Sequence, residues 1–521
     1  MKSTFSQRFK LIPEEMVIPF LLTLTQLTIL IAFHNNYNYF RDELYYIACS
    51  DHLDWGFVDH PPLSILILKI SRWVFGDSLH AVRVLPAIAV SFVVIIGAKI
   101  AKLFGGGTFA QAFASLTIVC ASGLIGHGRY FSMNAFDVLF WSLALYILVK
   151  IFQSGNQKLW VWFGIVAGLG LQNKYSVGFM IIGALGGMVF TSQRKQFKNK
   201  WFWMGMILAG LIFLPHIIWE IVNKYPSLEF MRNASQNKNV HLSVLDFFRG
   251  QLRDMNFLNA PIWMLGIFFL LFKSEVSKFK SLGWMYIIVF IAMIAGNAKV
   301  YYLSPIYPVL LAGGSVYVEQ LFSKYRLKWL KVSYPIALVL LALIALPFAV
   351  PVLPVNDFIR YEQLLGITPR QDERSSVSEL PQYYADQFGW EEMVSNFTSA
   401  YNTLTPDEQK QCVLYVRNYG EAAAIDFYGS KCGLPKALCG HNSYWYWGPG
   451  EKTGDIAIII GDSYDLEENL EDLQRAYQEV KLVATTDATY AMPFENGRQI
   501  FVCKGMRTTF QAIWEHERVF I

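Results

Sequence analysis

Acidic side chains gather in one short stretch near the start of the chain. Residues 40–63 read FRDELYYIACSDHLDWGFVDHPPL, and they follow an apolar run at 16–33 that is long enough to cross a bilayer. Asp42 and Glu43 are adjacent carboxylates at the outer end of this run. Such a pair can serve as a general base, as ligands of a hard metal ion, or as both. The alternative is an acidic cap at the membrane interface that only reports topology.

A second acidic element closes the same stretch. Asp59 and His60 precede Pro61 and Pro62, whose restricted backbone would hold both side chains in a defined orientation. The alternative is a turn that caps the helix expected to begin near Leu63. We interpret residues 34–80 as a catalytic outer loop with three catalytic acids: Asp42, Glu43 and Asp59. If a divalent metal is bound, its predicted ligands are Asp42, Asp59 and His60; no other cofactor is indicated.

Charged residues recur near the ends of later apolar runs. Arg129 follows the third run, Asp137 lies inside the fourth, and Lys174 and Lys299 each precede a further run. Ionisable groups at membrane depth are functional candidates by default, and cations are the usual partners of phosphate. The alternatives are a structural ion pair for Asp137 and snorkelling to headgroups for the lysines. The predicted substrate-binding residues are Tyr46, His60, Arg129, Asp137, Lys174, Lys299, Tyr301 and Tyr302, although the two later tyrosines also suit an aromatic belt.

The composition indicates an integral membrane protein. Of 521 residues, 54% are hydrophobic and only 16% are charged, whereas soluble domains carry about 25% charged residues. The net charge of +4 is spread along the chain and gives no argument for nucleic-acid binding. After the first run, apolar runs fall near 81–101, 108–126, 134–151, 159–172, 175–191, 201–219, 257–272, 281–297, 302–322 and 332–352.

About eleven membrane spans are therefore expected in a domain over residues 1–352. Lysine and arginine alternate with acids from one loop to the next, which predicts a cytoplasmic N-terminus. An odd number of spans then places residues 353–521 outside the cytoplasm, as a separate soluble domain.

The polar C-terminal part has the pattern of a small α/β domain. Residues 412–416, 456–460 and 499–503 are predicted strands, and residues 421–429 are a predicted helix. Cys432 and Cys439 are spaced so that a disulfide is possible in an oxidising compartment, and the spacing leaves that question open.

Six segments, in order, resemble the polyprenol-dependent membrane glycosyltransferases of the GT-C fold. The chain is most similar to bacterial members of the protein O-mannosyltransferase group, which are related to the lipid A aminoarabinose transferases. The segments are RDELYY (41–46), WGFVDHPPL (55–63), FGDSLHAVRVLPA (75–87), RYFSMNAFDVLFW (129–141), LQNKYS (171–176) and KVYYLSPIYPVLLAGG (299–314).

The resemblance implies inverting transfer of a sugar from a polyprenyl-phosphate donor. The acceptor would be a hydroxyl or phosphate of lipid A, an envelope glycan or a protein, at the extracytoplasmic face of a bacterial inner membrane. Asp42 matches the family's essential acid, so it would be the base or would orient the acceptor, with Glu43 as its partner. Asp59 and His60 match the second acidic element of that loop. By position, Arg129, Lys174 and Lys299 would bind the donor phosphate.

Two other classes of function remain open at this point. A polytopic transporter of lipids or solutes would also have many spans with charged residues inside them. Against it stand the absence of repeated halves, the acids of the 42–60 segment and the large outer domain. A non-catalytic assembly or polysaccharide-binding subunit would tolerate replacement of Asp42.

Overall fold

The computed structural model describes residues 13–370, 373–374 and 376–521. Its contacts divide the chain into two compact units, and each unit is built from three segments. The first unit contains the residues up to His34, Arg83–Pro215 and His241–Leu353. The second contains Asn35–Val82, His216–Val240 and Pro354–Ile521. The chain thus passes between the units five times.

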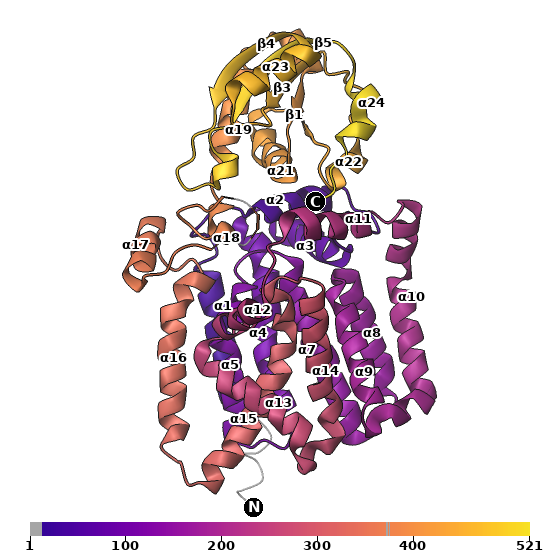
Figure 1. Ribbon diagram of the computed structural model, residues 1–521, viewed down its shortest axis with the longest axis vertical. Helices are drawn as coiled ribbons and strands as arrows, with labels where there is room; N and C mark the ends of the chain where they lie inside the picture. The colour runs from indigo at the N-terminus through magenta and orange to yellow at the C-terminus, as the bar shows by residue number, and fades with distance from the viewer. Residues whose placement is uncertain (1–12, 371–372, 375) are drawn as a thin grey trace, which may run out of the picture. The chain divides into compact units, whose positions relative to one another are not determined.

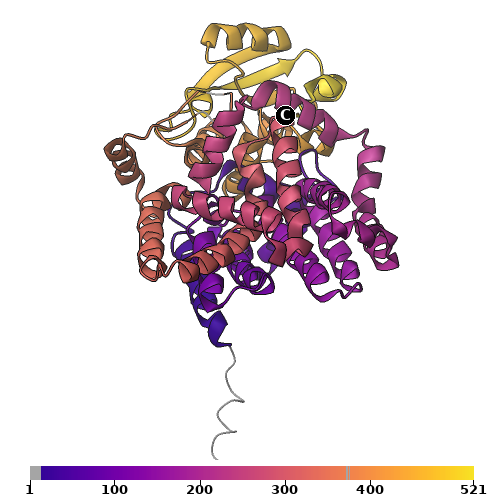
Figure 2. The same cartoon turned by 60° about the horizontal axis from the view of Figure 1, so that its bottom comes forward.

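The first unit is a bundle of apolar helices, which lie side by side in both Figure 1 and Figure 2. Its helices, two of which begin or end in the second unit, are α1 (Val17–Ala32), α4 (Leu79–Leu103), α5 (Thr108–Val119), α6 (Ser122–Gly126), α7 (Met133–Ser154), α8 (Leu159–Asn173), α9 (Ser176–Val189), α10 (Lys200–Val222), α12 (Val244–Asp254), α13 (Ala260–Phe272), α14 (Lys280–Ala295), the 3-10 helix η7 (Val300–Ile306), α15 (Tyr307–Lys324) and α16 (Leu330–Ala349).

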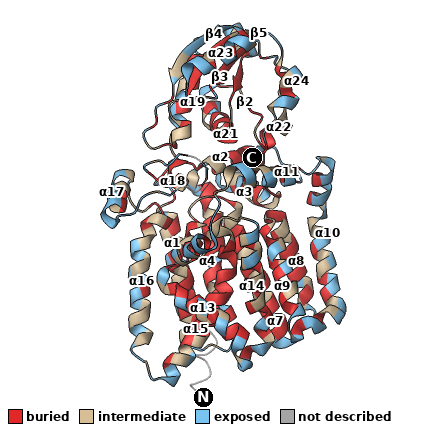
Figure 3. Ribbon diagram, viewed as in Figure 1, coloured by how far each residue is buried: buried red, intermediate tan, exposed pale blue. Residues whose placement is uncertain are grey.

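Its long apolar helices make the chain a multi-pass membrane protein. Among the described residues, six helical segments are long and apolar enough to cross a bilayer, and up to eight if each of two bent helix pairs forms one span. All eleven apolar runs expected from the sequence coincide with a helix or a helix pair, although the number of spans stays a prediction. The outermost of these helices, such as α10 and α16, show exposed apolar residues, as expected for a lipid-facing surface (Figure 3).

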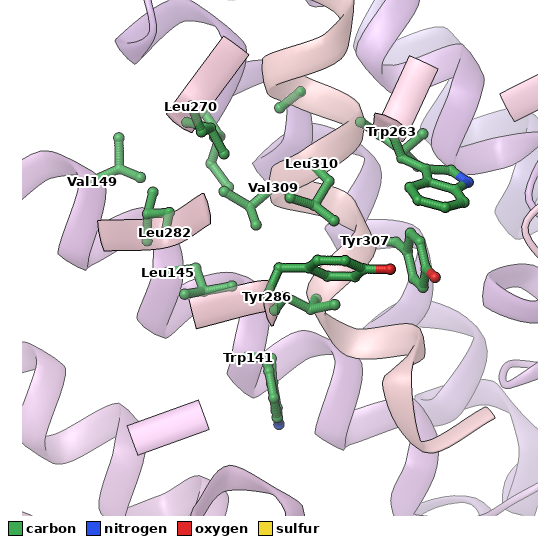
Figure 4. Packing of buried hydrophobic residues seen from close by; sticks show 14 of the residues in the cluster. Trp141, Leu145, Val149, Trp263, Leu270, Leu282, Tyr286, Tyr307, Val309 and Leu310 are labelled. Atoms are coloured by element: carbon green, nitrogen blue, oxygen red, sulfur yellow. The ribbon is translucent and has the colours of Figure 1, made fainter. Parts of the chain in front are cut away.

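The core of the bundle combines bulky side chains with close helix contacts. Trp141, Trp263 and Tyr307 are among its largest buried side chains, and Figure 4 shows them together with leucines and valines of neighbouring helices. Gly266 and Gly314 let α13 and α15 approach so closely that a Cβ on either would lie within about 2 Å of a carbonyl oxygen of the other helix. Small residues at such contacts are typical of membrane helix pairs.

The second unit combines the first outer segment with the C-terminal α/β region. Its helices and strands are α2 (Arg41–Asp51), α3 (Leu63–Phe75), α11 (Pro226–Asn233), α17 (Val355–Leu365), α18 (Gln382–Ala385), α19 (Trp390–Tyr401), α20 (Pro406–Gln411), β1 (Val413–Tyr415), α21 (Tyr419–Tyr428), β2 (Ala437–Leu438), α22 (Ser443–Trp447), β3 (Ile456–Ile460), α23 (Leu466–Ala476), β4 (Tyr477–Thr485), β5 (Gln499–Met506) and α24 (Phe510–Ile513).

The C-terminal region contains a five-stranded mixed sheet in the order β2-β1-β3-β5-β4. β1 pairs in parallel with β2 and β3, whereas β5 is antiparallel to β3 and β4. The three expected strands and the expected helix correspond to β1, β3, β5 and α21. The strands β2 and β4 were not expected, because β2 has two residues and β4 is mostly exposed and includes two charged residues. Cys432 is exposed, Cys439 is buried, and they form no disulfide.

The structure organises the first outer segment differently from the sequence expectation. The segment RDELYY does not end the first helix: α1 stops at Ala32, and a separate helix, α2, begins at Arg41. The expected domain boundary at 352/353 lies next to the last boundary between the units. However, Asn35–Val82 and His216–Val240 belong to the same compact unit as the C-terminal region.

Candidate active site

Asp42 lies in the first turn of α2, where the C-terminal region supplies its main partner. The Tyr419 hydroxyl donates a hydrogen bond to Asp42 Oδ1 (2.9 Å), and Arg41 Nε lies 3.6 Å from the same oxygen. The Asp42 side chain is 30% exposed. Burial raises the pKa of Tyr419 well above its usual range, so its hydroxyl stays protonated and donates. Asp42 is therefore an oriented and partly exposed side chain.

Glu43 has a different environment from its neighbour. It is fully buried, and its Oε2 accepts a hydrogen bond from the Phe40 backbone N–H (2.9 Å). This contact caps the N-terminus of α2, where a carboxylate also interacts favourably with the helix dipole. The position indicates that Glu43 sets the orientation of α2, and with it that of Asp42.

Asp59 is held by a tyrosine hydroxyl, which in turn contacts a serine of the C-terminal region. The Tyr45 hydroxyl donates to Asp59 Oδ1 (2.9 Å) and lies 2.8 Å from the Ser443 hydroxyl. Ser443 Oγ in turn accepts a hydrogen bond from the Val58 backbone N–H (3.2 Å). Burial raises the pKa of Tyr45 well above its usual range, which keeps this donor protonated. Both acids of the outer segment thus depend on residues of the C-terminal region.

His60 and Tyr46 lie behind these acids. His60 is buried, its Nδ1 lies 3.0 Å from the Pro61 carbonyl oxygen, and its Nε2 lies 3.8 Å from Asp59 Oδ1. Tyr46 is also buried and packs edge-on against the His60 ring, with a centroid distance of 5.1 Å. The structure places both side chains in the packing behind Asp59 and not on the surface.

The expected metal ligands do not form a metal centre. Among the described residues, no group of three or more His, Cys, Asp or Glu side chains is arranged to hold a metal ion. Asp42 is bonded to Tyr419, and only Asp59 and His60 of the expected set are close together. These residues do not fit a metal ion, and the reaction proposed below does not use one.

A second cluster of predicted residues lies in the first unit. Lys174 ends α8, and its ammonium donates to Asn134 Oδ1 (2.6 Å) and lies 3.8 Å from Asp137 Oδ2. Asp137 also accepts a hydrogen bond from the Ser176 hydroxyl. The structural ion pair considered for Asp137 is therefore present, and it joins two of the residues expected to bind substrate.

Aromatic rings cover the Lys174 ammonium. Its Nζ lies 4.6 Å from the Tyr302 ring centroid and 5.4 Å from that of Tyr301. His127 packs against Tyr301, and burial together with Lys174 and Arg129 lowers the pKa of His127 to about 3. His127 is thus neutral at physiological pH, and the positive charge of this cluster comes from lysine and arginine.

Arg129 and Lys299 are placed near the ends of other helices. The Arg129 guanidinium stacks on Tyr130 and donates to the carbonyls of Phe348 and Ala349 at the C-terminus of α16. Cations favour this end of a helix because of its dipole. Lys299 directly precedes η7, which carries Tyr301 and Tyr302. Both residues remain predicted phosphate ligands, and Arg129 also has a structural role.

Three functional residues were missed from the sequence. Tyr45, and not the predicted Tyr46, contacts Asp59, and its ring packs 4.7 Å from that of Tyr419. A helical pattern would have favoured Tyr45, because residues three apart share a helix face, which puts Tyr45 beside Asp42. Tyr419 and Ser443 follow Asp42 and Tyr45 by almost 400 residues, and no local signal connects them.

Comparison with known proteins relates parts of the chain to one class of enzyme. Residues 59–219 match the dolichyl-phosphate-mannose-protein mannosyltransferase family. The chain aligns over 93% of its length with the crystal structure of ArnT from Cupriavidus metallidurans bound to undecaprenyl phosphate, with a TM-score of 0.59, 13% identity and 97% of that chain covered. The chain has the GT-C fold. An Archaeoglobus fulgidus oligosaccharyltransferase aligns over 85% of this chain and 68% of its own, with a TM-score of 0.51 and 12% identity.

Curated relatives of this GT-C protein are glycosyltransferases. The chain is 21% identical over 271 residues to lipid A galacturonosyltransferase RgtD of Rhizobium johnstonii, a match that covers 51% of this chain and 57% of the relative. It is 27% identical over 105 residues to the polyprenol-phosphate-mannose–protein mannosyltransferase of Corynebacterium glutamicum, which covers 20% of each chain. The chain thus spans at most about half the length of these relatives. The comparisons support a transferase over a transporter.

Proposed function

We propose that this protein transfers a sugar from a polyprenyl-phosphate donor to a hydroxyl or phosphate of lipid A, an envelope glycan or a protein, with inversion at the sugar. The observation that carries the proposal is the environment of Asp42. It is the partly exposed member of the adjacent acid pair and is oriented by Tyr419, whereas its buried neighbour Glu43 caps helix α2.

In the proposed reaction, the acceptor oxygen attacks the anomeric carbon of the donor. The bond between that carbon and the phosphate oxygen breaks, and polyprenyl phosphate leaves with the bonding electrons. Asp42 takes the proton of the acceptor hydroxyl. Polyprenyl phosphate is a good leaving group, so a base is the more important proton-transfer group. Asp59, fixed by Tyr45, is the second acid and would orient the acceptor.

Positive charge is required where charge develops on the leaving phosphate. In the first unit, Lys174 is our main candidate for this role, with Arg129 and Lys299 as further candidates. Asn134, Asp137 and the rings of Tyr301 and Tyr302 hold the Lys174 ammonium in place before any ligand binds. A lysine fixed in this way binds phosphate with less loss of side-chain entropy.

We further propose that the reaction takes place at the extracytoplasmic face of a bacterial inner membrane. The alternation of charge between loops supports a cytoplasmic N-terminus and an external C-terminal region. One relative is a lipid A galacturonosyltransferase and the other is a protein mannosyltransferase, so the acceptor test includes both lipid A and protein.

The test compares matched carboxylate variants. Purified protein in nanodiscs is given undecaprenyl-phosphate-linked mannose, aminoarabinose or galacturonic acid, with lipid A or an envelope protein fraction, and free undecaprenyl phosphate is measured by mass spectrometry. We expect release by the wild type and at least about 100-fold less by Asp42→Asn, because general-base catalysis contributes about 10²–10⁴-fold. Asp51→Asn is the control, since Asp51 is an acid of the same helix whose surface ion pairs with Lys69 and Arg72 contribute little.

Tyr419→Phe refines the same test. It removes one hydrogen bond to Asp42 and keeps the ring, so we expect a turnover about threefold to tenfold below the wild type, in line with the roughly 0.5–1.5 kcal/mol of one hydrogen bond. Equal release by the wild type and Asp42→Asn would contradict the assignment of the base. Release of undecaprenyl phosphate at the same rate whichever sugar the donor carries would contradict the proposed transferase activity.

A further inference from the structure

Arg41 is a buried cation that lies between two carboxylates of the second unit. Its side chain is 11% exposed, its Nε lies 3.6 Å from Asp42 Oδ1, and its Nη2 lies 3.5 Å from Asp386 Oδ2. Asp386 is itself buried. A buried charge is costly unless an opposite charge compensates it. One positive charge is therefore divided between the acid assigned as the base and an acid of the C-terminal region.

Backbone and ring contacts fix Arg41 and Asp386 beside each other. The Asp386 carbonyl accepts hydrogen bonds from the Arg41 backbone N–H (3.0 Å) and from Trp390 Nε1 (2.9 Å). The Arg41 guanidinium also lies over the Tyr419 ring, 5.4 Å from its centroid. A Cβ on Gly420 would lie 2.5 Å from Arg41 Cγ, so α21 closes tightly on this side chain. Arg41 can therefore move only a short distance between its two carboxylates.

The contact between Arg41 and Asp42 stops short of a direct ion pair. At 3.6 Å, Arg41 Nε is too far from Asp42 Oδ1 for a hydrogen bond. Among the described residues, this buried nitrogen has no hydrogen-bond partner. The hydrogen bond to the same Asp42 oxygen comes from the neutral Tyr419 hydroxyl (2.9 Å). A carboxylate in a direct, hydrogen-bonded ion pair accepts a proton less readily. The observed spacing thus orients Asp42 without closing such a pair on it.

We propose that Asp386 is a positioning residue of the transferase: it holds the Arg41 guanidinium back from Asp42, so that Asp42 remains able to take the proton of the acceptor. This inference rests on the proposed function and adds a residue of the C-terminal region to it. Asp386 acts through Arg41 and is not itself a catalytic residue. When Asp386 is protonated or replaced by asparagine, the charge of Arg41 falls on Asp42 alone, and the two form a direct ion pair.

The ionisation of Asp386 gives the proposal a pH signature. Burial raises the pKa of Asp386 to about 6, Asp42 and Glu373 act in the same direction, and Arg41 opposes them. The charged or titratable groups that act on Asp386, or on which it acts, are Arg41, Asp42, Glu373 and Glu495. As the pH falls through 6, Asp386 takes up a proton and Arg41 loses its second partner. Turnover should fall over the same pH range.

The test follows the release of undecaprenyl phosphate by Asp386→Asn and the wild type between pH 5.5 and 8. At pH 8 we expect kcat of the variant to be about threefold to tenfold lower and KM for the donor to be unchanged. A direct opposite charge lowers a carboxylate pKa by about 1–3 units, and proton-transfer rates follow such a change in part. The wild type should lose a similar factor between pH 8 and pH 5.5, whereas kcat of Asp386→Asn should change little.

Matched variants separate positioning from a structural role. Asp472→Asn replaces an exposed acid of α23 whose surface ion pair with Arg475 contributes little, and it should follow the wild type at every pH. Asp386→Glu keeps the charge and should keep the pH dependence. If Asp386→Asn folds poorly, Gln382→Leu removes the amide that donates to Asp386 Oδ2 (3.4 Å) and should move the pH dependence to higher pH. A lower kcat of Asp386→Asn with the wild-type pH dependence would overturn the proposal.

A second measurement does not depend on activity. Thermal unfolding midpoints in detergent are compared for Asp42→Asn, Asp386→Asn and the double variant. Either acid alone can compensate the buried Arg41, so we expect the double variant to lose more than the sum of the two single losses. Additive losses would overturn the proposal whether or not the protein is a transferase. Losses beyond additivity without release from any donor would support the divided charge of Arg41 and contradict the proposed function instead.

Discussion

At the scale of single residues, burial in the second unit shifts the pKa values of several ionisable side chains. Asp42 and Asp59 each accept a hydrogen bond from a tyrosine whose pKa is raised by burial. Asp386, which lies beside Arg41, is itself buried, and burial raises its pKa to about 6. His441 shows the opposite effect: burial lowers its pKa to about 3.

The low pKa of His441 makes a prediction about stability in acid. The unfolded chain protonates this histidine near pH 6.5, whereas the folded chain resists protonation until about pH 3. Stability is therefore fully present above pH 6.5 and is lost as the pH falls towards 3. From this residue we expect a loss of about 2 kcal/mol between pH 7 and pH 5. His441→Gln keeps a donor for the Ile521 carbonyl, which His441 Nε2 contacts at 2.8 Å, but it cannot titrate.

The measurement is the thermal unfolding midpoint of the full chain in detergent at both pH values. We expect a smaller drop in His441→Gln than in the wild type. His516→Gln replaces an exposed histidine of the same region and should behave as the wild type. Carboxyl groups with raised pKa values, such as Asp386, increase stability as the pH falls. This effect is the same in the wild type and both variants. An equal drop in the wild type and His441→Gln would contradict the prediction.

At the scale of elements, the segment between α2 and α3 is held against the end of α10. Trp219 Nε1 donates to Asp54 Oδ2 (2.7 Å), and His216 Nδ1 lies 2.9 Å from the Trp55 carbonyl oxygen. Gly56 makes this approach possible, since a Cβ there would lie 2.3 Å from the Trp219 ring. The same segment contains Asp59, so its position determines where the second acid lies.

Gly56→Ala is therefore expected to destabilise the protein by about 1–3 kcal/mol, the usual effect of overpacking, and to reduce polyprenyl-phosphate release. Gly210→Ala, in α10 itself, is the control: a Cβ there meets nothing within 4 Å, and alanine favours a helix. Thermal midpoints and release rates are measured for both variants. A Gly56→Ala protein as stable and active as the Gly210→Ala protein would show that the segment can shift without consequence.

Sequence patterns predicted the helices and strands better than the contacts between residues far apart in the chain. The apolar runs and the strand at 456–460 were predictable because burial imposes a local pattern on neighbouring residues. Asp42, Asp59, Lys174 and Asp137 were singled out because charges beside apolar runs are unusual. Tyr419 and Ser443 could not be found in this way, since a tyrosine or serine in a soluble domain is ordinary until the fold places it beside an acid. The buried cap made by Glu43 was likewise not distinguishable from a catalytic carboxylate.

At the scale of the whole molecule, the two units share one chain that passes between them five times. Both contain residues of the proposed reaction: Asp42 and Asp59 belong to the second, and Lys174 belongs to the first. The proposed orientation places the C-terminal region outside the cytoplasm, and a native cysteine provides a direct test of it.

Cys432 is the one exposed cysteine of the six, and the others are buried. We therefore expect a membrane-impermeant maleimide to label intact cells at this residue and to leave a Cys432→Ser protein unlabelled. In the Cys432→Ser background, Asn156→Cys places a thiol in an exposed turn that is predicted to be cytoplasmic, and it should react only after permeabilisation. The reverse pattern, with Cys432 protected until the cells are opened, would invert the proposed topology.

Because the chain passes between the two units five times, residues that contact one another are synthesised at different times. Asp42 leaves the ribosome 377 residues before Tyr419, the residue that orients it. At about 5–20 residues per second, this delay amounts to roughly 20–75 s. During that interval the first outer segment is already synthesised, but its acids lack their hydroxyl partners. Each new chain therefore passes through a period in which it is inserted but inactive, and the proposed transferase can begin to work only when its translation is nearly finished.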